Sequence, residues 1–306
     1  MRKLPTLALG IIFALTLSAC SDSGEQAVVP VDTTTNEPAA ADSHSHARGD
    51  GTIAAIQGVS IDIVPSTLSA GKEANLQFTL ARFDEPIMDY VLKHEYPVHV
   101  VVVSDDLGSY QHLHPTMGKN GVWQLPITFD AGGIYRIVAD FVVVEGTDDV
   151  NYVVGTDIQV GGPDAQAFTL PAPAESIEVD GYVVSVSGSV SAADHSMLMF
   201  TVTKDGVPVE FENWLGASGH LVAIRQGDLA YAHMHPSGHL HDSSEADGMS
   251  ESDMTVGDSM SHGAMSMPGM IHFDAEFPAG AGTYRLFLQF QVGGKLSTAA
   301  FTAVVS

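Results

Sequence analysis

Residues His99–Pro115 read HVVVVSDDLGSYQHLHP, and residues His220–Pro236 read HLVAIRQGDLAYAHMHP. Both stretches begin with His and end in His-x-His-Pro, and an offset of 121 residues (220 minus 99) relates them. Each stretch consists of an apolar run, a polar turn and a second run that ends at the histidines, which is typical of a β-hairpin. An internal repeat of this length predicts two copies of one domain.

The register of the hairpin decides whether its histidines meet. If Gly227-Asp228 is a two-residue turn with Gly at its first central position, His220 lies opposite His235. The same register in the first copy sets His99 opposite His114. Residues opposite each other on antiparallel strands share a face, as do residues two apart on one strand. A slip of one residue would move the histidines of one strand to the other face.

This register places three imidazoles of each copy on one side of the hairpin, roughly 5 to 7 Å apart at Cβ. Three imidazole nitrogens at that spacing can share a divalent transition metal and leave one coordination position open. Histidines at strand ends also cap strands or bond to backbone carbonyls, so a structural role for the repeat stays open. The candidate ligands are His99, His112 and His114 in the first copy, and His220, His233 and His235 in the second.

The N-terminal segment Met1–Cys20 is typical of an export signal. A basic start precedes the apolar stretch Leu7–Leu17, which is shorter than the roughly 20 residues of a membrane span. The segment ends in Leu-Ser-Ala-Cys, which resembles the lipobox of bacterial lipoproteins. The resemblance implies a lipid anchor on Cys20, a place in the cell envelope facing the periplasm and, because Ser21 follows, sorting to the outer membrane rather than the inner one. An ordinary secretory signal with an incidental Cys is the alternative.

Cys20 is the single cysteine of the chain. The exported part therefore has no disulfide and no thiolate ligand, which excludes a blue-copper centre. Residues 21–51 are rich in Ser, Asp, Thr, Pro and Ala and predict a disordered linker. The linker holds a His-Ser-His at His44 and His46, which we attribute to chance.

The remaining stretch of about 250 residues is long enough for two domains. β-Branched and aromatic runs dominate it, and apolar residues alternate in Leu76, Phe78 and Leu80, as in a half-buried strand. About seven short strands per copy, separated by Gly and Pro turns, favour antiparallel sandwiches. The sequence thus predicts an all-β protein with one sandwich over residues 52–162 and a second over residues 163–306.

A second repeated patch refines this fold. Phe129–Arg136 (FDAGGIYR) matches Phe277–Arg285 (FPAGAGTYR) with one residue inserted. The Gly-x-Tyr that enters a late strand resembles the tyrosine corner of immunoglobulin-like Greek-key domains, in which the Tyr hydroxyl bonds to the backbone. The resemblance implies structural roles for Tyr135 and Tyr284 and two tandem immunoglobulin-like sandwiches.

The two copies differ after His-x-His-Pro, where residues 237–270 of the second copy form a long insertion rich in Met, His, Ser and Asp without Lys or Arg. This composition cannot form a packed core and predicts a mobile loop. Thioethers suit Cu(I) and Ag(I), and imidazoles suit copper and Zn(II). Loops of this composition resemble those of periplasmic copper-resistance and copper-handling proteins, which implies copper binding. The candidate ligands are His239, His241, Met249, Met254, Met260, His262, Met265, Met267 and Met270, with His272 just beyond.

The charge of the chain limits its partners. The net charge is −25, with 37 acidic and 12 basic residues. This balance argues against nucleic-acid binding, which needs Lys and Arg against phosphates. It favours cations, although acidity also keeps an exported protein soluble. No nucleophile elbow, H-E-x-x-H, P-loop or G-x-G-x-x-G motif is present, so the sequence predicts no enzyme.

Together these features predict a lipoprotein that binds, buffers or delivers copper, with silver or zinc as other cations and copper efflux or delivery proteins as partners. Two alternatives stay open. One is an envelope scaffold or adhesin, in which the repeated histidines are structural. The other is a metal-dependent enzyme, in which a three-His site activates water or dioxygen.

Overall fold

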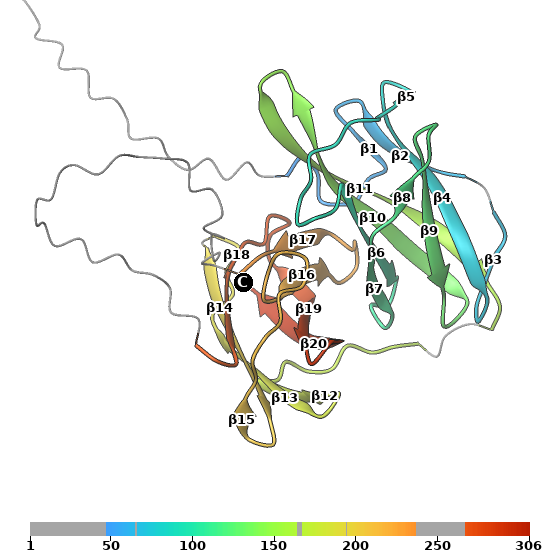
Figure 1. Ribbon diagram of the computed structural model, residues 1–306. Coiled ribbons are helices and arrows are strands. Elements are labelled where there is room, and N and C mark those ends of the chain that lie inside the picture. The colour runs from blue at the N-terminus through green and yellow to red at the C-terminus, as the bar shows by residue number, and fades with distance from the viewer. Residues whose placement is uncertain (1–46, 65, 164–166, 194, 237–266) are drawn as a thin grey trace, which may run out of the picture. The chain divides into compact units, whose positions relative to one another are not determined.

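The computed structural model describes residues 47–64, 66–163, 167–193, 195–236 and 267–306 (Figure 1). The predicted export signal, the predicted linker up to residue 46 and most of the Met/His-rich insertion lie outside these residues. All of the described residues belong to one compact unit. The regular elements of the described part are the twenty strands β1–β20. Within that part, no helix has the length and apolar character that crossing a membrane requires.

The first sandwich has two sheets whose strands are antiparallel except for the β3–β11 pair. One sheet has the order β1 (Ala55–Ile56), β2 (Val59–Ile63), β4 (Glu73–Arg82), β9 (Val122–Thr128) and β8 (Thr116–Met117), with β5 (Glu85–Pro86) beside β4. The other has the order β3 (Leu68–Ser69), β11 (Asp148–Gly161), β10 (Gly133–Glu145), β6 (Val98–Ser104) and β7 (Tyr110–Leu113). Alternate apolar residues of both sheets, such as Phe78 and Val100, meet in one core.

The second sandwich repeats this arrangement. One sheet has the order β12 (Ser176–Val179), β13 (Tyr182–Gly188), β14 (Ser196–Lys204) and β15 (Val207–Pro208), with β18 (Met270–Ala275) also paired to β14. The other has the order β17 (Tyr231–Met234), β16 (His220–Arg225), β19 (Gly282–Val292) and β20 (Lys295–Val305). Its core again draws on both sheets. The prediction of an all-β chain with two antiparallel sandwiches is confirmed.

The two tyrosine corners have the geometry that the repeat predicts. The Tyr135 hydroxyl donates a hydrogen bond to the carbonyl of Ala131 (3.0 Å), and the Tyr284 hydroxyl donates one to the carbonyl of Gly280 (2.7 Å). Both rings are buried. These tyrosines fix the loop that enters β10 and β19, the strands that lie next to β6 and β16.

Strands β6 and β16 are buried on both faces. In β6, Val100 and Val102 face the core of their own sandwich. Val101 and Val103 point the other way, into a third apolar cluster that also contains Val222 and Ile224 of β16 and that we call the inter-sandwich cluster. Each buried valine in it contributes about 1.5–3 kcal/mol. This second layer of burial explains why the β6 sequence is a continuous apolar run rather than an alternating one.

The inter-sandwich cluster is built from equivalent positions of the repeat. The 121-residue offset relates Val101 to Val222 and Val103 to Ile224. The Tyr110 ring of the first sandwich stacks on Phe287 of the second, with 4.0 Å between centroids. Because the same patch of each copy takes part, the packing resembles a two-fold interface between two subunits.

The hairpin register agrees with the sequence prediction, but the turn does not. Val222 pairs with His233 in the second copy, and Val101 pairs with His112 in the first, which is the predicted register. The predicted two-residue turn at Gly227-Asp228 is wrong, because Arg225 bonds to the carbonyl of Ala230 across a four-residue turn. Two interactions favour the wider turn: Leu229 is buried in the inter-sandwich cluster, and the Asp228 carboxylate accepts a hydrogen bond from the Ala230 amide.

The first sandwich begins earlier than the predicted boundary at residue 52. The Arg48 amide donates a hydrogen bond to the carbonyl of Asn151 in β11 (2.8 Å), and the Asp50 carbonyl accepts one from the Tyr231 amide in β17 (2.8 Å). The stretch from Arg48 to Gly51, which the composition assigned to the linker, therefore belongs to the folded part. Its backbone forms hydrogen bonds with the edges of strands, and amino-acid composition does not reveal this role.

Candidate metal centre

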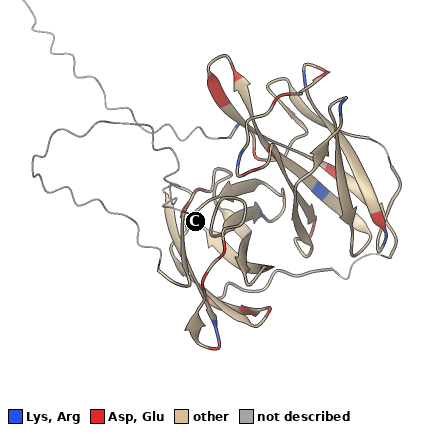
Figure 2. Cartoon of the chain, viewed as in Figure 1, with Lys and Arg blue, Asp and Glu red and all other residues tan. Residues whose placement is uncertain are grey.

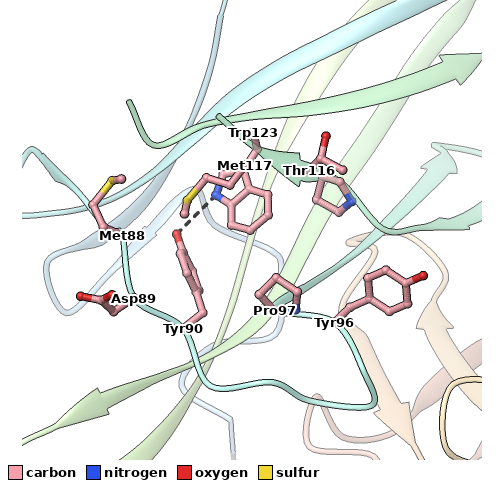
Figure 3. A pocket seen from close by; sticks show the side chains of 9 residues that line it. Met88, Asp89, Tyr90, Tyr96, Pro97, Thr116, Met117 and Trp123 are labelled. Carbon is pink, nitrogen blue, oxygen red and sulfur yellow. Dashed lines mark hydrogen bonds between the residues drawn. The ribbon is translucent and has the colours of Figure 1, made fainter. Parts of the chain in front are cut away.

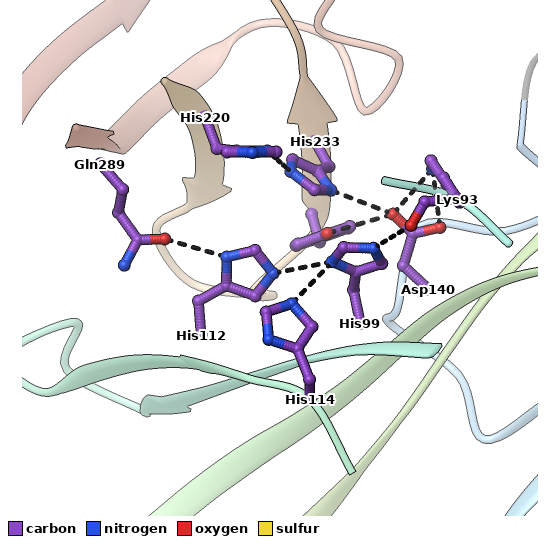
Figure 4. Close-up of polar contacts among 9 residues, drawn as sticks. Lys93, His99, His112, His114, Asp140, His220, His233 and Gln289 are labelled. Atoms are coloured by element: carbon purple, nitrogen blue, oxygen red, sulfur yellow. Dashed lines mark hydrogen bonds and ion pairs between the residues drawn. The ribbon is translucent and has the colours of Figure 1, made fainter. Parts of the chain in front are cut away.

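The three histidines of the first copy converge as the register predicts (Figure 4). Nδ1 of His99 lies 3.1 Å from Nε2 of His112 and 3.1 Å from Nε2 of His114. His99 lies on β6, His112 on β7 and His114 just after β7. We call these residues the first triad.

The histidines of the second copy converge in the same way. Nδ1 of His220 lies 3.2 Å from Nε2 of His233, and one ring nitrogen of each of His220, His233 and His235 lies within 4.8 Å of the others. We call these residues the second triad. Both triads lie on the faces of β6 and β16 that carry the inter-sandwich cluster, because His99 and His220 are two residues before Val101 and Val222.

Backbone carbonyls set the tautomer of the first histidine in each triad. Nε2 of His99 lies 2.7 Å from the carbonyl oxygen of Lys93, and Nε2 of His220 lies 3.1 Å from that of Trp214. A carbonyl oxygen only accepts, so Nε2 carries the proton in both rings and Nδ1 carries a lone pair that faces the triad. Lys93 and Trp214 are themselves related by the 121-residue offset.

The middle histidine of each triad contacts a polar side chain of the other sandwich (Figure 4). Nδ1 of His112 donates a hydrogen bond to Oε1 of Gln289 in β19 (2.9 Å). Nδ1 of His233 lies 3.4 Å from Oδ2 of Asp140 in β10. Asp140 and Gln289 are equivalent positions, because both follow the corner tyrosine of their sandwich by five residues. Polar groups behind a ligand histidine orient the ring and raise its basicity.

Asp140 is a buried carboxylate with several partners. Both of its oxygens contact the Lys93 ammonium, at 3.0 and 3.1 Å, and Oδ2 accepts a hydrogen bond from the Tyr231 hydroxyl (3.2 Å). Burial raises the pKa of Asp140, but the charge and hydrogen bond of Lys93, together with the nearby His99, outweigh it, so the pKa is lowered. Asp140 is therefore ionised and forms a buried ion pair with Lys93 beside the second triad.

Burial keeps all six triad histidines neutral at pH 7. It lowers the pKa of His114 to about 3 and that of His220 to about 4, against an ordinary value of 6.5. In His114 the neighbouring imidazoles lower the pKa further, whereas in His220 the bond to the Trp214 carbonyl opposes the shift. A neutral imidazole is the form that binds a metal ion. Burial also lowers the pKa values of His99, His112, His233 and His235.

The two triads lie next to each other. The ring centroids of His112 and His233 are 5.4 Å apart, and those of His99 and His233 are 5.6 Å apart. A seventh histidine, His94, stacks on His235 with 3.6 Å between centroids. The sequence analysis treated the triads as separate sites and did not consider His94, which lies beyond either repeat frame.

Two ring nitrogens of the second triad have no hydrogen-bond partner among the described residues, although they are buried. They are Nδ1 of His233 and Nε2 of His235. A buried polar atom without a partner costs about 1–3 kcal/mol. The Asp140 carboxylate is near the first of these atoms, and an ion held by His235 would supply a partner for the second.

A groove, whose lining is drawn in Figure 3, includes Tyr96, and this residue contacts His114 of the first triad. The Tyr96 ring stacks on His114 with 4.0 Å between centroids, and His114 is only partly buried. His114 is thus the least buried member of the first triad. Two of the lining residues carry thioethers that the sequence analysis did not select as ligands. The lining residues are Met88, Asp89, Tyr90, Tyr96, Pro97, Pro115, Thr116, Met117 and Trp123.

Of the other predicted ligands, the structure describes Met267, Met270 and His272, and it does not place these three in either triad. On β18, Ile271 and Phe273 face the core of the second sandwich, so Met270 and His272 face the opposite side, where His272 pairs with Met199 of β14. Met267 is exposed before β18. The remaining candidates of the insertion and the predicted lipidation residue lie outside the described residues, namely His239, His241, Met249, Met254, Met260, His262, Met265 and Cys20.

Asp140 and Gln289 were missed because they lie far in sequence from the histidines that they contact. Lys93 and Trp214 lie six residues before His99 and His220 and were missed because they bond through backbone carbonyls, which residue type does not reveal. Two of them nevertheless left a signal. Asp140 interrupts the apolar run IVADFVVV, and Gln289 interrupts LFLQFQV. Polar residues are depleted in buried strands unless they have a partner, so each interruption indicated a polar contact.

Comparisons with known proteins give a family but no activity. No curated protein matches the chain. Among solved structures, a DUF4785 family protein from Legionella pneumophila is 13% identical over 80% of this chain and 55% of its own, with a TM-score of 0.27, so the chain spans about half of that protein. An alpha-2-macroglobulin from Escherichia coli is 12% identical over 81% of this chain and 15% of its own, with a TM-score of 0.25. Likeness at this level carries no argument about function. The model of a domain of unknown function, DUF8832, matches residues 54–157 and 177–306, so the chain belongs to the DUF8832 family.

Proposed function

We propose that the protein binds copper ions at the two histidine triads and buffers or delivers them in the cell envelope. One observation carries the proposal: lone pairs converge in each triad. Nδ1 of His99 and Nε2 of His112 lie 3.1 Å apart, and each ring already donates its proton elsewhere, to Lys93 and Gln289. Two lone pairs at this distance repel each other unless a cation lies between them.

The spacing of these nitrogens suits a metal ion. Ligand nitrogens about 2.0–2.1 Å from a tetrahedral ion lie about 3.3 Å from each other. The facing nitrogens of the first triad are 3.1 Å apart, and those of His220 and His233 are 3.2 Å apart. Three neutral imidazoles, two of which have a carbonyl, amide or carboxylate group behind them, form a site that leaves one coordination position open.

The choice of copper rests on chemistry outside the triads. Imidazole alone suits copper, zinc and other borderline metals, whereas thioethers favour Cu(I) and Ag(I). The chain has 12 methionines, of which Met88 and Met117 line the groove beside the first triad. The methionines of the loop point to the same class of ion. Zinc and silver are the competing cations.

The surroundings favour an ion over another ligand. Acidic residues outnumber basic ones on both sandwiches (Figure 2), and the net charge of −25 raises the local concentration of cations. The lipobox-like Leu-Ser-Ala-Cys supports a lipid anchor at the envelope. The open coordination position would let a partner protein withdraw the ion, which is what buffering or delivery requires.

The test is a metal titration of the purified protein. Cu(I), Cu(II), Ag(I) and Zn(II) are each titrated against a competing chelator. We expect two copper ions per chain with dissociation constants well below micromolar, and one ion in either H114A or H235A. The matched control is H195A, which removes an exposed histidine paired with Glu276. Wild-type binding no tighter than roughly micromolar, about 8 kcal/mol, would refute the proposal.

A further inference from the structure

We infer that the two triads form one dinuclear centre in which the second triad takes up Cu(II) first and its ion weakens Cu(II) binding at the first triad. The inference rests on the proposed function and adds how the two sites act on each other. It follows from three features: the distance between the triads, their burial and the difference between Asp140 and Gln289.

The distance between the triads is short enough for direct interaction. The rings of His112 and His233 belong to different triads, and their centroids are 5.4 Å apart. An ion about 2 Å from a ligand nitrogen lies about 3 Å from the ring centroid, so the two ions would lie no more than about 12 Å apart. Two Cu(II) electron spins at this separation broaden each other's resonance.

Burial makes the two ions interact through a poorly screened medium. His99 and His220 are 1% and 0% exposed, and the inter-sandwich cluster adjoins both triads. Coulomb repulsion grows with the product of the charges, so two Cu(II) ions repel each other about four times as strongly as two monovalent ions at the same sites. Filling one triad with Cu(II) therefore weakens the other more than filling it with Ag(I) does.

The polar side chain that contacts the middle histidine decides which triad binds Cu(II) first. His233 of the second triad lies beside the Asp140 carboxylate, whereas His112 of the first triad lies beside the neutral amide of Gln289. A carboxylate raises the basicity of the ligand ring more than an amide does, and loss of such a group lowers metal affinity about 10–100-fold. The Lys93 ammonium offsets part of the carboxylate charge, and it donates hydrogen bonds to both oxygens of Asp140.

The first measurement compares the protein with one and with two equivalents of Cu(II) by electron paramagnetic resonance. The second measures the affinities for Cu(II) and for Ag(I) by titration against a competing chelator. In the wild-type protein we expect a resolved signal at one equivalent and a dipole-broadened signal at two. In H235A, which leaves only the first triad intact, we expect that triad to bind Cu(II) at least about 10-fold more tightly than it binds the second ion in the wild type, with a smaller ratio for Ag(I).

Two variants test the order of filling. D140N is expected to give, at one equivalent of Cu(II), the signal of the first triad as seen in H235A. The control D157N removes an exposed carboxylate paired with Arg136 and is expected to behave as wild type. Two bound ions without broadening, or with equal affinity in H235A, would overturn the inference and leave the proposed function standing. Absence of tight binding in the wild type would refute the proposed function itself.

Discussion

Asp140 of β10 lies 3.4 Å from Nδ1 of His233 in β17, and these two residues belong to different sandwiches. The reciprocal contact joins Gln289 of β19 to His112 of β7. Each sandwich thus supplies three histidines to its own triad and one polar group to the other. The polar contacts of neither triad are complete within one copy of the repeat. The packing of the two sandwiches therefore has a direct role in the candidate site.

Removal of the Lys93 ammonium should destabilise the protein and strengthen its response to metal. In K93M the Asp140 carboxylate loses its cation in a buried place, and breaking a buried pair costs about 3–5 kcal/mol, less here because Lys93 is 20% exposed. The Lys93 carbonyl still holds His99. We expect a lower free energy of unfolding without metal and a larger gain on adding copper than in the wild type, measured by urea denaturation.

The control for this prediction is K295M, which removes a lysine paired with Asp180 at a mostly exposed position. Exposed pairs contribute about 0–1 kcal/mol. If K93M and K295M gave the same small loss, the buried pair beside the second triad would have no special role.

Weakening the inter-sandwich cluster should affect both sandwiches together. Val222 is fully buried in that cluster, and V222A should lower the free energy of unfolding by about 1.5–3 kcal/mol. One tryptophan lies in each sandwich, Trp123 and Trp214, so their fluorescence reports on each half. We expect coincident transitions in the wild type and in V222A. Separate transitions in the wild type would show that the sandwiches unfold independently; V304A, at an exposed site, is the control.

The metal-free protein should lose stability as the pH falls from 7 towards 4. The folded pKa of His220 is about 4 and that of His114 about 3, whereas the unfolded chain takes up these protons near the ordinary value of 6.5. Below that value the unfolded state binds more protons than the folded state, so the free energy of unfolding decreases, by at most about 1.4 kcal/mol per pH unit for each histidine. Urea denaturation at pH 7 and pH 5 measures the slope.

Variants show which histidines cause this dependence of the free energy of unfolding on pH. In H114A one partly buried neutral histidine is absent, so the dependence on pH should become shallower. H195A should keep the wild-type slope, because His195 is exposed. A stability that is constant between pH 7 and pH 5 would contradict the burial of neutral imidazoles.

Much of the candidate site was predictable from the repeat, because hairpin register depends on local pairing and the two copies report the same spacing. The continuous run of β6 was also informative, since burial on both faces implies a further layer. The partners of the triads were not predictable: Asp140 and Gln289 reach the histidines across the packing of two sandwiches, and no periodicity within one copy encodes that docking. The composition of the Met/His-rich insertion does not say where its side chains lie in space, so its relation to the triads stays a prediction.

Removal of the Tyr96 ring should open the first triad to exchange. Tyr96 stacks on His114 and lines the groove beside it, and it is 37% exposed. In Y96A the ring no longer covers the partly buried ligand, so a chelator should extract copper from the first triad several-fold faster, while extraction from the second triad is unchanged. Stopped-flow mixing of the copper-loaded protein with a chromogenic chelator measures both rates. The control F83A removes an aromatic ring that is 75% exposed in the turn between β4 and β5. Equal acceleration in Y96A and F83A would show that general loosening, rather than loss of the cover over His114, controls release.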